Sequence, residues 1–167
     1  MEKWIKVLKD NNLFAAKRHI KDGADVNESA ENGESVLATA LRCKCDNDLI
    51  MFLIDSGADI NNFDEEGVSI LDMAVTYDNI QIVRYLISEG IDVNKTKRRS
   101  KFTPLMAAAS YGRVEMTKLL IEHGADKEAV DAKGISVLDF ARKMNKKSIL
   151  KLLDYDESIP KNTNYAR

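Results

Sequence analysis

Seven of the eight glycines recur at two fixed positions of a repeat of 33 to 34 residues. The first set closes four similar segments, beginning with Asp-Gly-Ala-Asp-Val-Asn at 22–27: Gly23, Gly57, Gly90 and Gly124. The second set follows about ten residues later, with Lys101 in the place of a fourth member: Gly33, Gly67 and Gly134. Self-similarity at this period is typical of a solenoid, in which small units stack because none can bury its apolar face alone.

Each unit also carries a short signature of Ser or Thr, any residue, then leucine. The signatures begin at four equivalent residues: Ser35, Ser69, Thr103 and Ser136. Ser and Thr cap helix starts by accepting backbone N–H groups, and Pro104 suits the first helical position. An alanine three residues after each leucine leaves room for a close neighbour, and an amphipathic stretch then runs to the next glycine, which suits a helix end. The pattern predicts two helices in each unit.

These motifs resemble the ankyrin-repeat family, whose pattern Gly-x-Thr-Pro-Leu-His-x-Ala-Ala through Gly-Ala-Asp is matched best by residues 101–126. The resemblance implies an all-α ankyrin-repeat solenoid of antiparallel helix pairs joined by hairpin-like fingers. We predict one domain over residues 1–153, with a capping repeat at each end and three full repeats ending at Gly57, Gly90 and Gly124. Residues 154–167 are polar and are predicted to form a separate tail.

Two features depart from the family pattern. The histidine of the family tetrapeptide is replaced in every unit, by Ala38, Asp72, Met106 and Asp139. We therefore expect weaker bracing between repeats than in consensus members. One extra residue lies in the first full repeat, around 43–48, and another in the third finger, which also has Lys101 instead of glycine. We expect these two places to hold what is specific to this protein.

Composition favours a soluble intracellular protein. The net charge of −2 exerts no general attraction toward nucleic acid or an anionic membrane. The longest apolar run, 49–54, is far shorter than the roughly 18 residues that span a membrane. Cys43 and Cys45 are too close together to staple a solenoid, which favours a reducing compartment. We expect a cytoplasmic monomer without membrane contact.

No group of residues forms a recognisable catalytic motif. His19 and His123 have no nucleophile nearby in the sequence, and the cluster of Cys43, Cys45 and two aspartates offers only two of the four ligands that a closed zinc site needs. The glycines are taken up by the repeat, so no phosphate-binding loop is present. We predict that the chain is not an enzyme and that it holds no cofactor or metal.

The resemblance instead implies a concave binding surface made of fingers and first helices. Six residues after the signature leucines, one stripe of equivalent positions reads Cys43, Tyr77, Tyr111 and Met144. One residue after the second glycine position, another reads Glu34, Val68, Phe102 and Ile135. Tyrosines often anchor interfaces, so Tyr77, Tyr111 and Phe102 are the predicted anchors, supported by Val68, Ile135 and Met144. The alternative is that Val68, Phe102 and Ile135 pack between adjacent hairpins.

Charge is sorted between the second and third fingers. The second carries Asp64, Glu65 and Glu66, whereas the third has five cations within 95–101. Exposed charge runs of this kind are usually solvated, and the two fingers could simply attract each other. Alternatively, Arg98 and Arg99 contact an acidic or phosphorylated partner. In the binding groove, Arg98, Arg99, Glu65 and Glu66 are predicted to form the rim.

Together these observations predict a non-catalytic scaffold that binds another protein. Two alternatives remain: a nucleic-acid contact by 95–101, which the overall acidity disfavours, and an immunity-like subunit that inhibits an enzyme.

Overall fold

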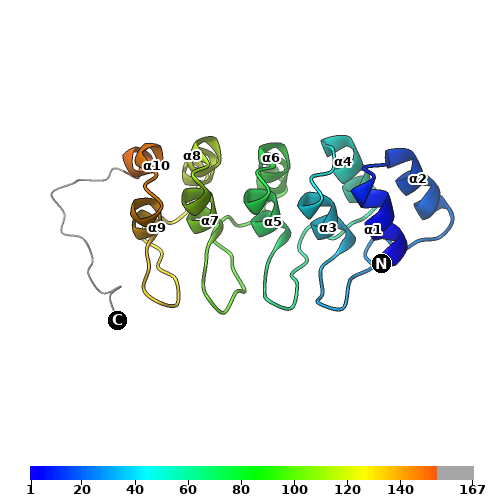
Figure 1. The fold of residues 1–167 in the computed structure, drawn as a ribbon, viewed down its shortest axis with the longest axis horizontal. Helices are drawn as coiled ribbons and strands as arrows, with labels where there is room; N and C mark the ends of the chain where they lie inside the picture. Colours follow the sequence, from blue (N-terminus) through cyan, green and yellow to red (C-terminus); the bar gives the residue numbers. More distant parts are fainter. Residues whose placement is uncertain (154–167) are drawn as a thin grey trace.

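The computed structural model describes residues 1–153, and the predicted tail 154–167 lies outside the described residues. Within that range the chain forms antiparallel pairs of short helices (Figure 1). Their bounds are α1 (Glu2–Lys9), α2 (Leu13–Lys21), α3 (Val36–Arg42), α4 (Asn47–Asp55), α5 (Ile70–Thr76), α6 (Ile80–Ser88), α7 (Pro104–Tyr111), α8 (Val114–Glu122), α9 (Val137–Lys143) and α10 (Lys147–Leu152). The predicted all-α solenoid is confirmed.

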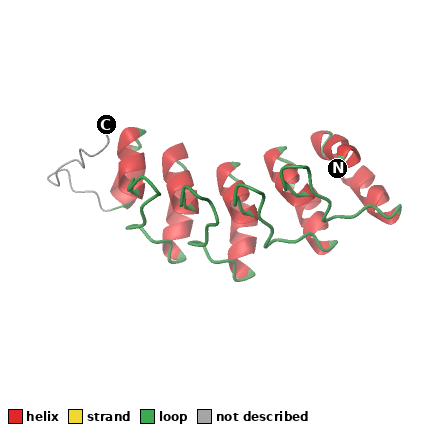
Figure 2. Ribbon diagram, turned by 90° about the horizontal axis from the view of Figure 1, so that it is seen from below, coloured by secondary structure: helices red, strands yellow, loops and turns green. Residues whose placement is uncertain are grey.

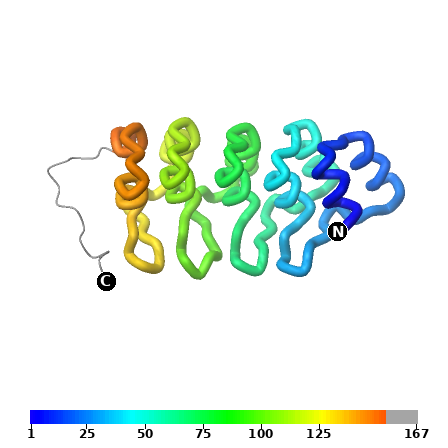
Figure 3. The backbone as a smooth tube through the Cα atoms, viewed as in Figure 1, coloured from blue at the N-terminus to red at the C-terminus, as the bar shows by residue number. Residues whose placement is uncertain are grey.

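The helices form two layers with hairpin-like fingers on one side. The odd-numbered helices lie next to the fingers and the even-numbered helices form the outer row (Figures 1 and 3). We number the fingers by the segments that join one pair to the next: finger one (22–35), finger two (56–69), finger three (89–103) and finger four (123–136). Seen from below in Figure 2, the fingers lie side by side across the row of helices.

The signature residues begin the inner helices as predicted. Ser35, Ser69, Thr103 and Ser136 are the N-caps of α3, α5, α7 and α9, and each side chain accepts a hydrogen bond from the third backbone N–H of its helix. The alanines that follow the signature are fully buried: Ala40, Ala74, Ala108 and Ala141. Because alanine has no side chain beyond Cβ, neighbouring inner helices can pack closely there.

The eighth glycine, Gly112, marks a third repeated position that the sequence pattern hid. Gly112 adopts the left-handed conformation just after α7, with φ of +73°. The residues at the same place in the other four pairs also have positive φ: Asn11, Lys44, Asp78 and Asn145. Asparagine and aspartate tolerate this conformation better than most residues. The conformation is therefore periodic although the residue type is not.

The extra residue of the first full repeat lies in the turn between α3 and α4. This turn spans 43–46, whereas the turn between α5 and α6 spans only 77–79. The longer turn contacts the N-terminal helix pair: Asn11 Nδ2 donates to Asp46 Oδ2 at 2.6 Å, and Asp46 N donates to Asn11 Oδ1 at 2.9 Å. The buried Cys45 thiol donates to the Leu8 carbonyl at 3.2 Å, and burial raises the pKa of this thiol to about 12. The turn therefore fastens the N-terminal pair to the repeats.

Candidate functional site

The first predicted stripe lies where the inner helices end and turn toward the outer row. Tyr77, Tyr111 and Met144 stand at the C-terminal ends of α5, α7 and α9. Tyr111 is 55% exposed and Met144 is 47% exposed, while Tyr77 is half-buried. Tyr77 also lines a hollow of about 360 Å³ that is shared with the turn of the preceding repeat. These three side chains form an accessible, largely apolar row across neighbouring repeats.

The second predicted stripe lies at the opposite ends of the same helices. Val68, Phe102 and Ile135 directly precede the N-caps of α5, α7 and α9, and all three are half-buried. Phe102 meets Phe140 of the next repeat edge to face, with ring centroids 5.1 Å apart. Part of the Phe102 surface is thus used between hairpins, as the alternative interpretation held. At 1.5 Å per helical residue, the two stripes are roughly 13 Å apart.

The basic finger is directed toward its own chain. In finger three, Lys97 Nζ lies 4.1 Å from the ring centroid of Phe63 in finger two, and Lys95 Nζ lies 5.7 Å from the same centroid. Arg98 Nη2 lies 3.5 Å from Asp72 Oδ1. Arg99 and Lys101 are exposed, as are Glu65 and Glu66 of finger two. Three of the five cations of finger three therefore meet an aromatic ring or a helix carboxylate instead of the acidic tip of finger two.

Asp72 replaces the family histidine and is fully buried at the start of α5. Its Oδ2 atom accepts hydrogen bonds from the Ser69 backbone N–H at 3.0 Å and from Ser69 Oγ at 2.8 Å. Loss of solvent raises the pKa of the Asp72 carboxyl, and the charge of Arg98 partly offsets this rise. The second and third full repeats are thus joined here by an ion pair, which the sequence did not reveal.

At two other junctions between neighbouring repeats, an asparagine side chain makes a pair of hydrogen bonds to the next repeat, which we call a bracket. Asn27 Nδ2 donates to the Gly57 carbonyl at 2.9 Å, and Asn27 Oδ1 accepts from Asp59 N at 2.8 Å. Asn94 makes the same two bonds, to the Gly124 carbonyl at 2.9 Å and from Asp126 N at 2.8 Å. Each bracket joins one finger to the first residues of the next.

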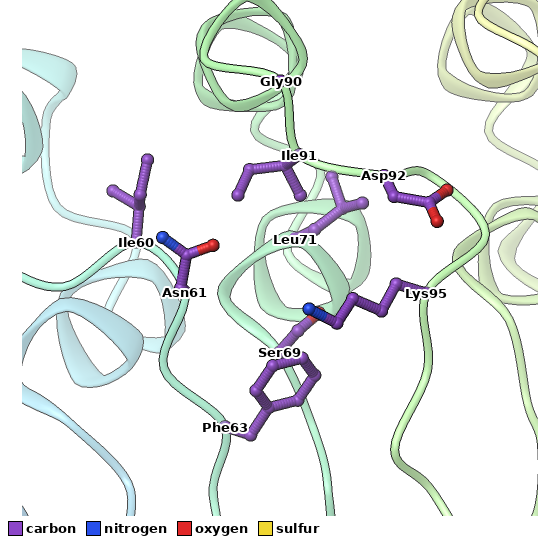
Figure 4. A pocket seen from close by; sticks show the side chains of 9 residues that line it. All are labelled: Ile60, Asn61, Phe63, Ser69, Leu71, Gly90, Ile91, Asp92 and Lys95. Carbon is purple, nitrogen blue, oxygen red and sulfur yellow. The ribbon is translucent and has the colours of Figure 1, made fainter.

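The equivalent bracket is missing between fingers two and three. Within residues 1–153, the Asn61 side chain makes no hydrogen bond to Gly90 or Asp92, the corresponding partners. A cavity of about 130 Å³ lies at this junction (Figure 4). The sequence carries one signal for it, because the Gly-Ala-Asp of the bracketed junctions reads Gly-Ile-Asp at 90–92.

The junction between fingers two and three also differs from the other junctions in the contacts made by the finger tips. Glu65 N donates to the Asn32 carbonyl at 3.2 Å, and Ala132 N donates to the Ser100 carbonyl at 2.7 Å. These bonds join finger one to two and finger three to four. In the part of the chain that the structure describes, no backbone hydrogen bond joins the tips of fingers two and three. This junction is held by Arg98 and by close packing, not by the regular backbone contacts.

The brackets give a stability prediction with an internal control. Asn94→Ala removes two hydrogen bonds between repeats, so we expect it to lower the free energy of unfolding by about 1–2 kcal/mol. Asn61→Ala removes none, so we expect a change within about 0.5 kcal/mol. Urea unfolding followed by circular dichroism measures both. An equal loss for the two variants would contradict the unbracketed junction.

Over residues 1–153, stacked helix pairs with perpendicular fingers and brackets between repeats define a helical-repeat solenoid without a central sheet. A profile described as Ankyrin repeats (3 copies) matches residues 4–97, more than half of the chain, and one described as Ankyrin repeats (many copies) matches residues 90–141. The chain belongs to the ankyrin-repeat family, as its sequence motifs predicted. Ankyrin repeats are in general protein–protein interaction modules.

Curated relatives share parts of this repeat array. Palmitoyltransferase AKR1 of Lachancea kluyveri is 43% identical over 68 residues, which cover 41% of this chain and 9% of that protein. Human palmitoyltransferase ZDHHC13 is 32% identical over 118 residues, covering 68% of this chain and 18% of the relative. Alpha-latrotoxin-Lg1a of Latrodectus geometricus is 28% identical over 137 residues, or 80% and 10% of the two chains. The match thus spans less than a fifth of each relative.

Two structural findings bear on other functions. Among residues 1–153, no helix is both long enough and apolar enough to cross a membrane. The same residues bring together no group of three or more His, Cys, Asp or Glu side chains that could hold a metal ion.

Proposed function

We propose that this chain is a non-catalytic scaffold that binds another protein through the inner-helix surface between the two stripes. The observation that carries the proposal is the exposure of Tyr111 and Met144 at equivalent positions of adjacent repeats. Large apolar side chains that are exposed together commonly mark an interaction surface. Tyrosine provides a large contact area at low entropic cost and a hydroxyl group that orients a partner.

The two stripes would have different roles. Tyr77, Tyr111 and Met144 would form the anchoring row, and the half-buried Val68, Phe102 and Ile135 would provide a second, shallower wall. The exposed Arg99, Glu65 and Glu66 would lie at the rim, where charges affect the association rate more than the affinity. Arg98 was also predicted at the rim, but its ion pair with Asp72 supports an indirect role, namely positioning finger three.

The scaffold would present about 800 Å² to its partner, the usual share of one side in a stable complex. Contacts with Phe63 and Asp72 occupy three of the five cations of 95–101, so a nucleic-acid role for this segment is less well supported than protein binding. An enzyme-inhibiting role would use the same surface. We also propose that the scaffold is a monomer in the cytoplasm. The thiols of Cys43 and Cys45 are free, which suits that reducing compartment.

Truncating the anchors tests this proposal. A partner is first captured by crosslinking and identified by mass spectrometry, and its affinity is then measured for Tyr77→Ala and Tyr111→Ala. Because buried tyrosine anchors commonly contribute 2 kcal/mol or more, we expect a loss of about 30-fold or more for at least one variant.

Phe14→Ala is the matched control, because Phe14 is 78% exposed but lies on α2, away from the stripes. Its affinity should equal that of the unmodified chain. Unchanged affinity of both tyrosine variants, with an intact circular dichroism spectrum, would exclude this surface.

A further inference from the structure

The start of finger three presents two backbone groups that bind a carboxamide elsewhere in the molecule. At the starts of fingers two and four, a glycine carbonyl and the N–H two residues later hold the side-chain amides of Asn27 and Asn94. The equivalent groups in finger three are the Gly90 carbonyl and the Asp92 N–H. Within residues 1–153 neither group has a hydrogen-bond partner. Finger three therefore presents the same pair of backbone groups, but no asparagine side chain is bound to them.

Ile91 is the residue that differs most from its counterparts at the bracketed junctions. The corresponding residues at the bracketed junctions, Ala58 and Ala125, are small and buried. Ile91 is half-buried and lines the cavity, and Figure 4 shows its side chain and the Asn61 amide extending into the same space from neighbouring loops. The larger side chain thus takes up room that Asn61 would cross to reach Gly90 and Asp92.

The cavity has the shape and the chemistry of a small binding site. Its volume of about 130 Å³ is close to the ~150 Å³ of a protein cavity that holds benzene. Leu71, Ile60 and Phe63 line it with apolar side chains, and Asn61 and Lys95 contribute polar groups, with the Lys95 side chain extending toward its middle (Figure 4). Apolar walls beside a few convergent polar groups are features of small-ligand sites, and this cavity, with a mixed lining, is at the small end of such sites.

We propose that this cavity binds a primary carboxamide carried on a small apolar body. The amide NH₂ would donate to the Gly90 carbonyl and the amide oxygen would accept from the Asp92 N–H, as the side chains of Asn27 and Asn94 do at their junctions. The apolar body would lie against Leu71 and Phe63. The site is separate from the proposed protein-binding row, because it lies at the N-terminal end of α5 and Tyr77 lies at the C-terminal end.

Titration with benzamide, followed by NMR of the backbone amides and leucine methyl groups, tests the proposal. We expect saturable shifts at Asp92 and Leu71, in the millimolar range typical of so small a ligand. Benzoate is the matched control, since it has the same ring and size but no N–H to offer the Gly90 carbonyl. Absence of shifts with benzamide, or equal binding of benzoate, would overturn the proposal.

A second probe, N-acetylglutamine methylamide, distinguishes the two sources of a carboxamide. Binding at least as tight as that of benzamide would indicate a side chain supplied by a protein. Preference for benzamide would indicate a free ligand. Either outcome supports the carboxamide class.

Two variants test whether the Gly90 carbonyl and the Asp92 N–H, and not only the apolar walls of the cavity, bind the ligand. Ile91→Ala restores the Gly-Ala-Asp motif, so Asn61 should occupy the backbone groups and weaken benzamide binding about tenfold, the equivalent of one hydrogen-bonded pair. Adding Asn61→Ala removes this competitor and should restore binding. If the double variant binds benzamide no better than Ile91→Ala alone, the Gly90 carbonyl and the Asp92 N–H do not bind the carboxamide.

Discussion

Replacing Gly67 by alanine is expected to destabilise the protein by at least about 3 kcal/mol, whereas the same change at Gly134 should cost only about 1 kcal/mol. The two glycines occupy equivalent positions in fingers two and four, with φ of +78° and +76°. A Cβ atom at Gly67 would overlap the carbonyl carbon and oxygen of Lys97, while one at Gly134 would meet nothing within 4 Å. Both variants share the cost of the left-handed backbone, so their difference measures the contact between fingers two and three.

Urea unfolding measured by far-ultraviolet circular dichroism gives the two free energies. Fluorescence of Trp4, the single tryptophan, reports separately on the N-terminal helix pair, where this side chain is fully buried. Equal losses for Gly67→Ala and Gly134→Ala would show that finger three does not press against Gly67.

Replacing Arg98, the cation opposite Asp72, is the second change with a large expected effect. Arg98→Met should lower the free energy of unfolding by roughly 3 kcal/mol at neutral pH, because it leaves a fully buried carboxylate without its partner. Methionine retains much of the apolar stem of arginine, so the change is mainly one of charge. Arg99→Met is the control at the neighbouring exposed position and should change stability by less than about 0.5 kcal/mol.

The cost of Arg98→Met should depend on pH. Burial raises the pKa of Asp72 in the folded protein, and loss of the Arg98 charge raises it further. Between the ordinary pKa of aspartate and this raised value, the folded chain holds a proton that the unfolded chain releases, so stability falls as the pH rises. The penalty should therefore be full at neutral pH and shrink as the pH falls toward 4. A penalty that is constant from pH 7 to pH 4 would show that packing, not charge, causes it.

The sequence was most informative where one residue type serves one purpose in every repeat. Ser35, Ser69, Thr103 and Ser136 were predicted as caps and are caps, because a hydroxyl at a helix start has few other uses at that spacing. It was least informative where different residues serve the same purpose. The left-handed turns after the inner helices escaped notice, since lysine, aspartate and asparagine occupy positions equivalent to Gly112.

The candidate surface was only partly predictable. The spacing that aligns Tyr77, Tyr111 and Met144 follows from the repeat, and the structure places them in one row. Their exposure does not follow from it, because the side chains of the next repeat decide how much of each remains open. Phe102 shows this dependence, since Phe140 covers part of its ring.

By itself, the sequence determined the architecture, because a period of 33 to 34 residues makes each helix pair bury its apolar face against similar neighbours. Only the tertiary structure decided how the second and third full repeats meet. There Arg98 lies opposite Asp72, and within residues 1–153 Asn61 makes no side-chain hydrogen bond to the backbone of Gly90 or Asp92. The residues of each pair lie about 26 to 31 positions apart in neighbouring repeats, and their distances depend on the packing of whole repeats. The Gly-Ile-Asp motif at 90–92 is the one local sign of the difference.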